Sequence, residues 1–220
     1  TQFAITKQHS ASSHIQQIIA GCNRAKNLII QILDFSRQRN NGNDNRLTHP
    51  GEIVKESVKL LKASFPSSIK LESHVRKDIG CIQADPSQVH QAVMNLCTNA
   101  RQAIESAMGK VRIVVREMDH APGSPIKDLS GDLPFGRYIS ISVSDTGKGI
   151  APEAVGKIFN PYFTTKAKGD GTGLGLAVVH GIVTRFNGAI TTHTEPGKGS
   201  VFNLFFPRYS PAQVPAPRTK

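Results

Sequence analysis

The sequence predicts an α+β fold: a two-layer α/β sandwich preceded by a long bundle helix. Three observations support this class. Residues 13–38 place apolar side chains at the three-four spacing of a helix. Further along, short alternating or apolar segments typical of strands are interspersed with amphipathic helical segments. Helices packed on one face of a mostly antiparallel sheet form two layers around a single core.

The first predicted element is the helix over residues 13–38. At about 1.5 Å per residue this helix is ~40 Å long, so it needs helical partners to bury its apolar side. The alternative is an amphipathic helix that packs on the domain that follows. The polar residues 39–45 are expected to end the helix and to form a hinge. The apolar stripe consists of Ile15, Ile18, Cys22, Ala25, Ile29 and Ile32.

The sandwich is expected over residues 46–207, after a partial helical segment at 1–45 and before a disordered Pro-rich tail at 208–220. One helix should begin after His49-Pro-Gly51, and another after Asp85, where Pro and Gln suit the first turn. A surface loop of little functional weight is expected at 119–136, which is rich in Pro, Gly and Asp. The remaining elements are a helix at 174–186 and strands at 69–75, 80–83, 111–115, 138–143, 189–194 and 201–206.

Length and composition are those of a folded domain. The chain has 220 residues, 38% of them hydrophobic, and no apolar stretch approaches the ~20 residues needed to cross a bilayer. It starts at Thr1 without a Met and shows no targeting signal, so we expect a fragment of a longer protein. Cys22, Cys81 and Cys97 lack metal-ligand spacing, which favours reduced thiols in a cytosolic compartment.

The net charge raises the question of nucleic acid, because the chain has 27 Lys and Arg against 16 Asp and Glu, a formal charge of +11. Basic surfaces drive nonspecific DNA binding. Here the cations are spread without a run of five or more, and no DNA-reading motif accompanies them. The charge therefore favours an anionic nucleotide and an acidic protein partner over nucleic acid.

The motifs with the most chemical information lie in the second half of the chain. An Asp beside two glycines can present a carboxylate to an exocyclic amine while the backbone approaches a flat ring. A second glycine cluster runs into a helix, where free N–H groups suit a phosphate. These features predict a nucleotide site. The motifs are Asp145-Thr-Gly-Lys-Gly-Ile150, Phe159-Asn-Pro-Tyr-Phe-Thr-Thr-Lys166 and Gly171-Thr-Gly-Leu-Gly-Leu176.

Two asparagines upstream sharpen this interpretation. Asn95 and Asn99 are four residues apart on the helix predicted after Asp85, so they share a face. Neutral carboxamides can coordinate a hard cation through oxygen, or hydrogen-bond to phosphate, without adding negative charge beside a triphosphate.

In order and spacing, these motifs resemble the catalytic ATP-binding domain of sensor histidine kinases of two-component systems, in the superfamily shared with gyrase, Hsp90 and MutL. The resemblance covers roughly residues 47–207 and implies the Bergerat ATP-binding fold. It also implies that residues 13–38 are the second helix of a dimerisation and phosphotransfer hairpin. The matching segments are similar to the asparagine box at 95–100, the glycine boxes at 145–149 and 171–175, the phenylalanine box at 159–166 and the closing strand at 197–207.

The resemblance implies ATP and Mg²⁺ as cofactors and assigns roles to individual residues. Asp145 is expected to accept from the adenine amino group. Asn99 is the expected Mg²⁺ ligand, and Asn95 and Lys166 are the catalytic candidates, with Lys166 at the γ-phosphate. Residues 159–171 are expected to form a lid that is mobile without nucleotide. The other candidates for nucleotide binding are Gly147, Gly149, Ile150, Phe159, Gly171, Thr172, Gly173, Leu174, Gly175 and Leu176.

Simpler interpretations stay open for several of these residues. Asp145 before Thr-Gly is also a common turn, a helix Asn is also a cap, and Lys166 is also a solvated loop cation. Lys148 points either over the nucleotide or to water. The histidines His90 and His180 are expected at the surface or in hydrogen bonds rather than in catalysis. One departure is Gln102, where better-known kinases often have Lys or Arg; the candidate substitute is Arg101.

The activity implied is an ATP-dependent protein-histidine kinase. Related hydrolases and protein-serine kinases usually carry Glu where this chain has Asn95, and a carboxamide cannot act as a base at neutral pH. A nonenzymatic nucleotide-gated interaction module and a Bergerat-type ATPase are the alternatives. His9 and His14 lack the acidic neighbour of the family's phosphoacceptor, so the acceptor is expected upstream of Thr1. The chain should then bind ATP without autophosphorylating.

The resemblance also implies partners for the intact protein. It should form a homodimer through the helical hairpin and pass its phosphate to the Asp of a response regulator receiver domain. It should be cytoplasmic, or the cytosolic portion of a membrane-bound sensor attached through parts absent here. No nucleic acid is expected.

Overall fold

The computed structural model describes residues 46–105, 108–121, 127–128, 131–166 and 171–210. All of them belong to the second of two compact units of the chain, which begins at residue 42. The predicted bundle helix at 13–38, the hinge at 39–45 and the tail from residue 211 onward lie outside the described residues.

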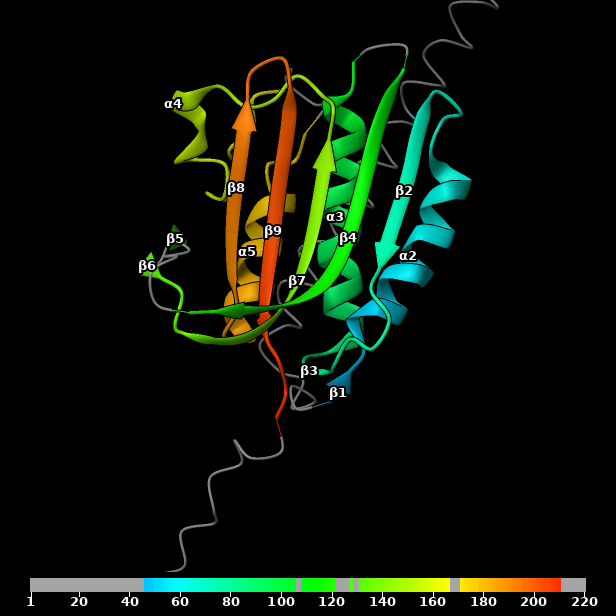
Figure 1. Cartoon of the computed structure of the whole chain (residues 1–220). Helices are drawn as coiled ribbons and strands as arrows, with labels where there is room; N and C mark the ends of the chain where they lie inside the picture. Colours follow the sequence, from blue (N-terminus) through cyan, green and yellow to red (C-terminus); the bar gives the residue numbers. More distant parts are fainter. Residues whose placement is uncertain (1–45, 106–107, 122–126, 129–130, 167–170, 211–220) are drawn as a thin grey trace, which may run out of the picture. The chain divides into compact units, whose positions relative to one another are not determined.

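A five-stranded sheet forms one layer of this unit (Figure 1). The strand order is β2-β4-β7-β9-β8. Strand β2 runs parallel to β4, and the other neighbours are antiparallel, as expected for a mostly antiparallel sheet. The bounds are β2 Ile69–Val75, β4 Gly109–His120, β7 Gly136–Asp145, β8 Ala189–Glu195 and β9 Gly199–Pro207.

Three helices cover one face of the sheet: α2 (Pro50–Ser64), α3 (Pro86–Ala103) and α5 (Gly175–Arg185) (Figure 1). This is the predicted two-layer sandwich. Helix α3 contacts both α2 and α5. It begins as the sequence predicts, because the side chain of the N-cap Asp85 accepts a hydrogen bond from Ser87 N at 2.8 Å. Among the described helices, none has the length and apolar character required to span a bilayer.

The core fills the space between the helices and the sheet. Alternate residues of strands β4 and β7 point toward the helices and are almost fully buried. They pack against the apolar stripe of α3. Because that stripe is buried, the opposite side of α3 is left for other contacts. The strand residues are Val111, Ile113, Val115, Ile139, Ile141 and Val143, and the helix residues are Val89, Val93, Leu96, Cys97 and Ala100.

The segment 119–136 differs from the plain surface loop expected from its composition. Strand β4 continues to His120, β7 begins at Gly136, and two short strands between them, β5 (Lys127–Asp128) and β6 (Gly131–Asp132), pair with each other. Among the described side chains of this segment, that of Leu133 is apolar and buried. It belongs to a second cluster made of Leu133, Tyr138, Ala189 and Phe205.

Three more short elements complete the unit. Strand β1 (Leu47–Thr48) pairs with β3 (Ile82–Gln83), which confirms part of the strand predicted at 80–83. A one-turn helix, α4 (Pro152–Val155), follows the first glycine box and was not expected from the sequence.

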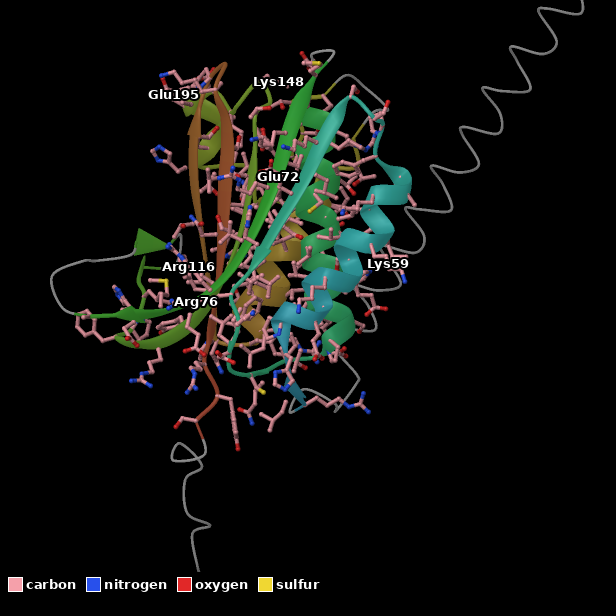
Figure 2. All side chains as sticks on the ribbon, turned by 45° about the vertical axis from the view of Figure 1, so that its right-hand side comes forward. Lys59, Glu72, Arg76, Arg116, Lys148 and Glu195 are labelled. Atoms are coloured by element: carbon pink, nitrogen blue, oxygen red, sulfur yellow. The ribbon has the colours of Figure 1, made fainter. Side chains whose placement is uncertain are left out.

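Glu72 lies on the sheet face that the helices leave open (Figure 2). It forms ion pairs with three cationic side chains. Its carboxylate lies 2.9 Å from Lys70 Nζ, 3.6 Å from Lys110 Nζ and 3.1 Å from Arg112 Nη2. The hydrogen bond from Lys70, with further help from the other two cations, lowers the pKa of Glu72 from 4.5 to about 2. Part of the positive charge of the chain is thus compensated locally.

The two described cysteines should differ in reactivity. Cys97 is fully buried, and burial raises its pKa to about 12, so its reactive thiolate is not populated near neutral pH. Cys81 is partly exposed. In the native protein at about pH 8, iodoacetamide should alkylate Cys81 and leave Cys97 unmodified, as peptide mass spectrometry will show. Unfolding in urea is the control and should equalise the two; equal labelling without urea would contradict the prediction.

Candidate nucleotide-binding site

The first glycine box lies at the end of the sheet where β7 ends at Asp145. Asp145 is 8% exposed, and its Oδ1 accepts a hydrogen bond from Gly147 N at 2.8 Å. This contact is the local turn that the sequence also allowed. Burial raises the pKa of the Asp145 carboxyl, opposed by backbone hydrogen bonds from Gly147 and Ser200.

The first glycine box is held by close backbone contacts that only glycine permits. A Cβ on Gly147 would lie 2.6 Å from Ala103 O at the end of α3. Gly149 has a φ of 69°, and a Cβ there would lie 2.2 Å from Glu195 O. The box is therefore clamped between α3 and the turn that joins β8 to β9.

Lys148 lies between these two glycines, and its backbone joins the same two neighbours. Lys148 N donates to Ala103 O at 3.0 Å, and Lys148 O accepts from Gly197 N at 2.8 Å. The Lys148 side chain forms an ion pair with Glu105, with Nζ 2.7 Å from Oε1, and it lies at the same end of the sheet as Glu195 (Figure 2). Lys148 is exposed, which agrees with the direction toward water that the sequence left open; the sequence did not indicate the pairing with Glu105.

Ile150 ends the first glycine box. Ile150 N donates to Thr194 Oγ1 at 2.9 Å, and the Ile150 side chain packs against the main core. Thr194 in turn contacts Ser200 Oγ at 2.9 Å, so β8 and β9 both support this residue.

Helix α3 brings its asparagines to the start of α5. Asn95 and Asn99 are both partly buried, on the side of α3 that does not form the apolar stripe. A Cβ on Gly175, the first residue of α5, would lie 3.5 Å from Asn99 Nδ2. The asparagine box and the second glycine box are therefore neighbours in space.

The phenylalanine box is anchored at both ends of its apolar part. Phe159 and Phe163 pack against the main core, and the Phe159 ring meets Phe202 edge-on at a centroid distance of 6.4 Å. Tyr162 N donates to Gly173 O at 2.9 Å, which ties this box to the second glycine box. The middle of the expected lid, residues 167–170, lies outside the described residues.

The second glycine box forms the N-terminus of α5. Leu174 is the N-cap of this helix, Leu174 N donates to Thr172 Oγ1 at 3.3 Å, and Leu176 packs against the core. Among the described residues, no side chain caps α5. The first N–H groups of the helix are therefore available to an anion.

Lys166 ends the phenylalanine box, and its Nζ donates a hydrogen bond to Gln102 Oε1 in the last turn of α3. A Cβ on Gly171 would lie 3.0 Å from Lys166 Cδ, so the lysine stem passes close to this glycine. This hydrogen bond connects Lys166 to the C-terminal end of α3, although Lys166 and Gln102 are far apart in the sequence.

The two histidines near the site have structural contacts. His90 Nδ1 lies 2.8 Å from the hydroxyl of the buried Ser57, between α2 and α3. The His180 ring stacks at a tilt on Phe159, with centroids 5.7 Å apart. His90 is hydrogen-bonded, as expected from the sequence. His180 differs from the expectation of a surface or hydrogen-bonded residue, because its Nε2 is buried without a hydrogen-bond partner among the described residues.

The donor set bears on which metal the site suits. Within the described ranges, no group of three His, Cys, Asp or Glu is arranged to hold a metal ion. The polar groups near the start of α5 are carboxamides from α3. Such oxygens fit Mg²⁺ that arrives with a triphosphate, because Mg²⁺ keeps several waters and takes few protein ligands.

Sequence reasoning missed several residues that build the site. Nothing in the sequence indicated the ion pair between Glu105 and Lys148 or the hydrogen bond from Ile150 to Thr194, because Glu105 and Thr194 belong to no motif. A signal existed for Gly199, within the Gly-Lys-Gly turn before the closing strand: a Cβ there would lie 2.0 Å from Asp145 O.

Comparisons with known proteins agree with this geometry. The family described as histidine kinase-, DNA gyrase B-, and HSP90-like ATPase matches residues 84–210. The sensor kinase CckA of Brucella abortus (strain 2308) is 34% identical over 194 residues, which are 88% of this chain and 20% of CckA. The sensor histidine kinase ZraS of Escherichia coli (strain K12) is 38% identical over 156 residues, 70% of this chain and 29% of ZraS.

Solved structures share the fold. A nucleotide-free form of the catalytic domain of histidine kinase ThkA has a TM-score of 0.58 at 25% identity, covering 74% of this chain and 97% of that one. The chain spans between a fifth and three tenths of the length of CckA and ZraS. Since the family match covers more than half of the chain, the chain belongs to the histidine kinase-, DNA gyrase B-, and HSP90-like ATPases.

Proposed function

We propose that this chain is the catalytic part of a two-component sensor histidine kinase, which transfers the γ-phosphate of ATP to a His on an upstream helix. The observation that supports this best is the pair of carboxamides on one face of α3: Asn99 lies beside Gly175 at the start of α5, and Asn95 lies one turn earlier on the same helix. A carboxamide cannot deprotonate water or a hydroxyl. The base must then lie elsewhere, which suits transfer to an external histidine.

In this proposal Asp145 selects adenine as the nucleobase. The carboxylate, held by Gly147 and almost buried, accepts a hydrogen bond from the adenine amino group. Guanine presents an acceptor at the same place and is therefore disfavoured. Gly147, Gly149 and Ile150 let the backbone approach the ring.

The polyphosphate lies between α3 and α5. The N–H groups of Gly175 and Leu176 at the start of α5 bind phosphate oxygens, and Lys166 meets the terminal phosphate. Asn99 is the expected Mg²⁺ ligand, assisted by Asn95. Catalysis then rests on positioning and charge neutralisation.

The proposal extends to the intact protein. Residues 1–45 belong to a dimerisation hairpin, residues 46–207 to the catalytic domain and residues 208–220 to a tail. The partners are a second copy of the protein and a response regulator receiver domain.

The first prediction tests the adenine contact with Asp145→Asn. Asn keeps an acceptor for Gly147 N–H but replaces the other oxygen with a donor, which faces the adenine amino group. ATP affinity should fall at least ~10-fold, since a buried hydrogen bond is lost, while wild type should bind GTP at least ~10-fold more weakly than ATP. The melting temperature of the variant is the control for folding, because Asp145 also accepts a backbone hydrogen bond from Ser200. Calorimetry of both proteins measures the affinities; unchanged ATP binding would refute the role of Asp145.

The second prediction concerns the metal. Asn99→Ala should remove the Mg²⁺-dependent part of ATP affinity and leave the metal-free affinity intact. Titrations with Mg²⁺ and with EDTA measure the two parts. The fold should survive because Asn99 lies off the apolar stripe of α3. A magnesium dependence equal to that of wild type would exclude Asn99 as the ligand.

The third prediction tests the reaction. None of the eight histidines in the chain is followed by an acidic residue, so γ-labelled ATP should leave no phosphate on the chain itself. A supplied dimerisation hairpin with a His-Glu pair should acquire phosphate that is acid-labile and base-stable. Phosphate on Ser or Thr would overturn the proposal. Steady phosphate release without transfer would favour an ATPase, and ATP binding without either would favour a nonenzymatic module.

A further inference from the structure

We propose that Gln102 is a positioning residue that holds Lys166 at the place of the terminal phosphate, so that the cation for this phosphate comes from the phenylalanine box and not from α3. The inference rests on the proposed function, because it concerns how the same site meets ATP. It assigns a role to the residue at which this chain departs from better-known kinases.

The spacing along α3 places Gln102 in line with the asparagines. Asn95, Asn99 and Gln102 follow each other at intervals of four and three residues, so the three carboxamides form one stripe along the helix. Asn99 lies beside Gly175 at the start of α5, and Gln102 is one turn further on, in the last turn of α3. Gln102 therefore extends the stripe beyond the expected metal ligand.

Lys166 is directed to the end of this stripe by three features. Lys166 N donates to Thr164 Oγ1 at 3.2 Å, the stem passes Gly171, where a Cβ would lie 3.0 Å from Lys166 Cδ, and Nζ donates to Gln102 Oε1. Because Gln102 lies one helical turn beyond Asn99, this hydrogen bond directs the ammonium group to the side of α3 that carries the expected metal ligand.

The charge of the side chain at position 102 affects whether the Lys166 ammonium group can lie against the last turn of α3. A Lys or Arg would repel the ammonium group, and a Glu would neutralise it and bring negative charge toward the phosphates. A neutral carboxamide accepts the hydrogen bond from Lys166 without adding a charge of its own. Arg101 does not replace Gln102 in the stripe, because residues two apart on a helix, such as Asn99 and Arg101, do not share a face.

A double-mutant cycle on the 220-residue chain tests the inference, with ATP and ADP affinities measured by calorimetry in Mg²⁺. Lys166→Ala should weaken ATP binding roughly 10-fold and ADP binding less than about 2-fold, because only ATP has the terminal phosphate. Gln102→Ala should weaken ATP binding about 3-fold or more, again sparing ADP. The double variant should match Lys166→Ala, since Gln102 acts through the lysine.

A charge swap provides a second, independent readout. Gln102→Lys supplies its own cation from α3, so in that background Lys166→Ala should change ATP affinity less than about 2-fold. Gln83→Ala, at an exposed glutamine of β3 outside the site, is the matched control and should bind both nucleotides as wild type does.

Two results would overturn the inference while leaving the proposed function intact. One is a cycle in which the effects of Gln102→Ala and Lys166→Ala simply add. The other is an equal loss of ATP and ADP affinity in Gln102→Ala, which indicates a structural role. A wild-type chain that binds neither nucleotide would instead overturn the proposed function, and this inference with it.

Discussion

The structure depends most on the close backbone approach at the end of β7. A Cβ on Gly199 would lie 2.0 Å from Asp145 O, one on Gly147 would lie 2.6 Å from Ala103 O, and one on Gly149 would lie 2.2 Å from Glu195 O. These distances are shorter than the contacts that real Cβ atoms make, so glycine is required at each position. The three contacts bring β9, α3 and the β8–β9 turn onto the strand end and thereby place Asp145 in the site.

Helix α3 contacts the first glycine box through Ala103 O and also carries Asn99, which is expected to lie near the phosphates. Its apolar stripe packs into the core against β4 and β7, which fixes the rotation of the helix about its axis. With that rotation fixed, the carboxamides of Asn95 and Asn99 lie toward the start of α5. The same helix contributes Ala103 O to the first glycine box. Core packing and ligand geometry are therefore set by one element.

The described residues on the phosphate side of the site are neutral or positively charged. Asn99 and Gln102 of α3 are neutral carboxamides, the N-cap Leu174 makes no side-chain capping bond at the start of α5, and Lys166 contributes a positive charge. Asp145 is the acidic residue predicted to contact the nucleotide, and it lies at the end of β7, where adenine and not a phosphate is expected. The positive charge on the open sheet face is instead compensated in part by Glu72.

The sequence by itself determined the fold class, the order of the longer helices and strands and the motifs of the candidate site, because these depend on local periodicity, capping residues and spacing along one element. The α3 stripe from Val89 to Ala100 and the N-cap Asp85 are examples. Only the tertiary structure decided which distant segments meet: Lys166 with Gln102, Lys148 with Glu105, and Leu133 with the open face of the sheet. Such contacts join residues from different elements, and no local pattern records the three-dimensional register between those elements.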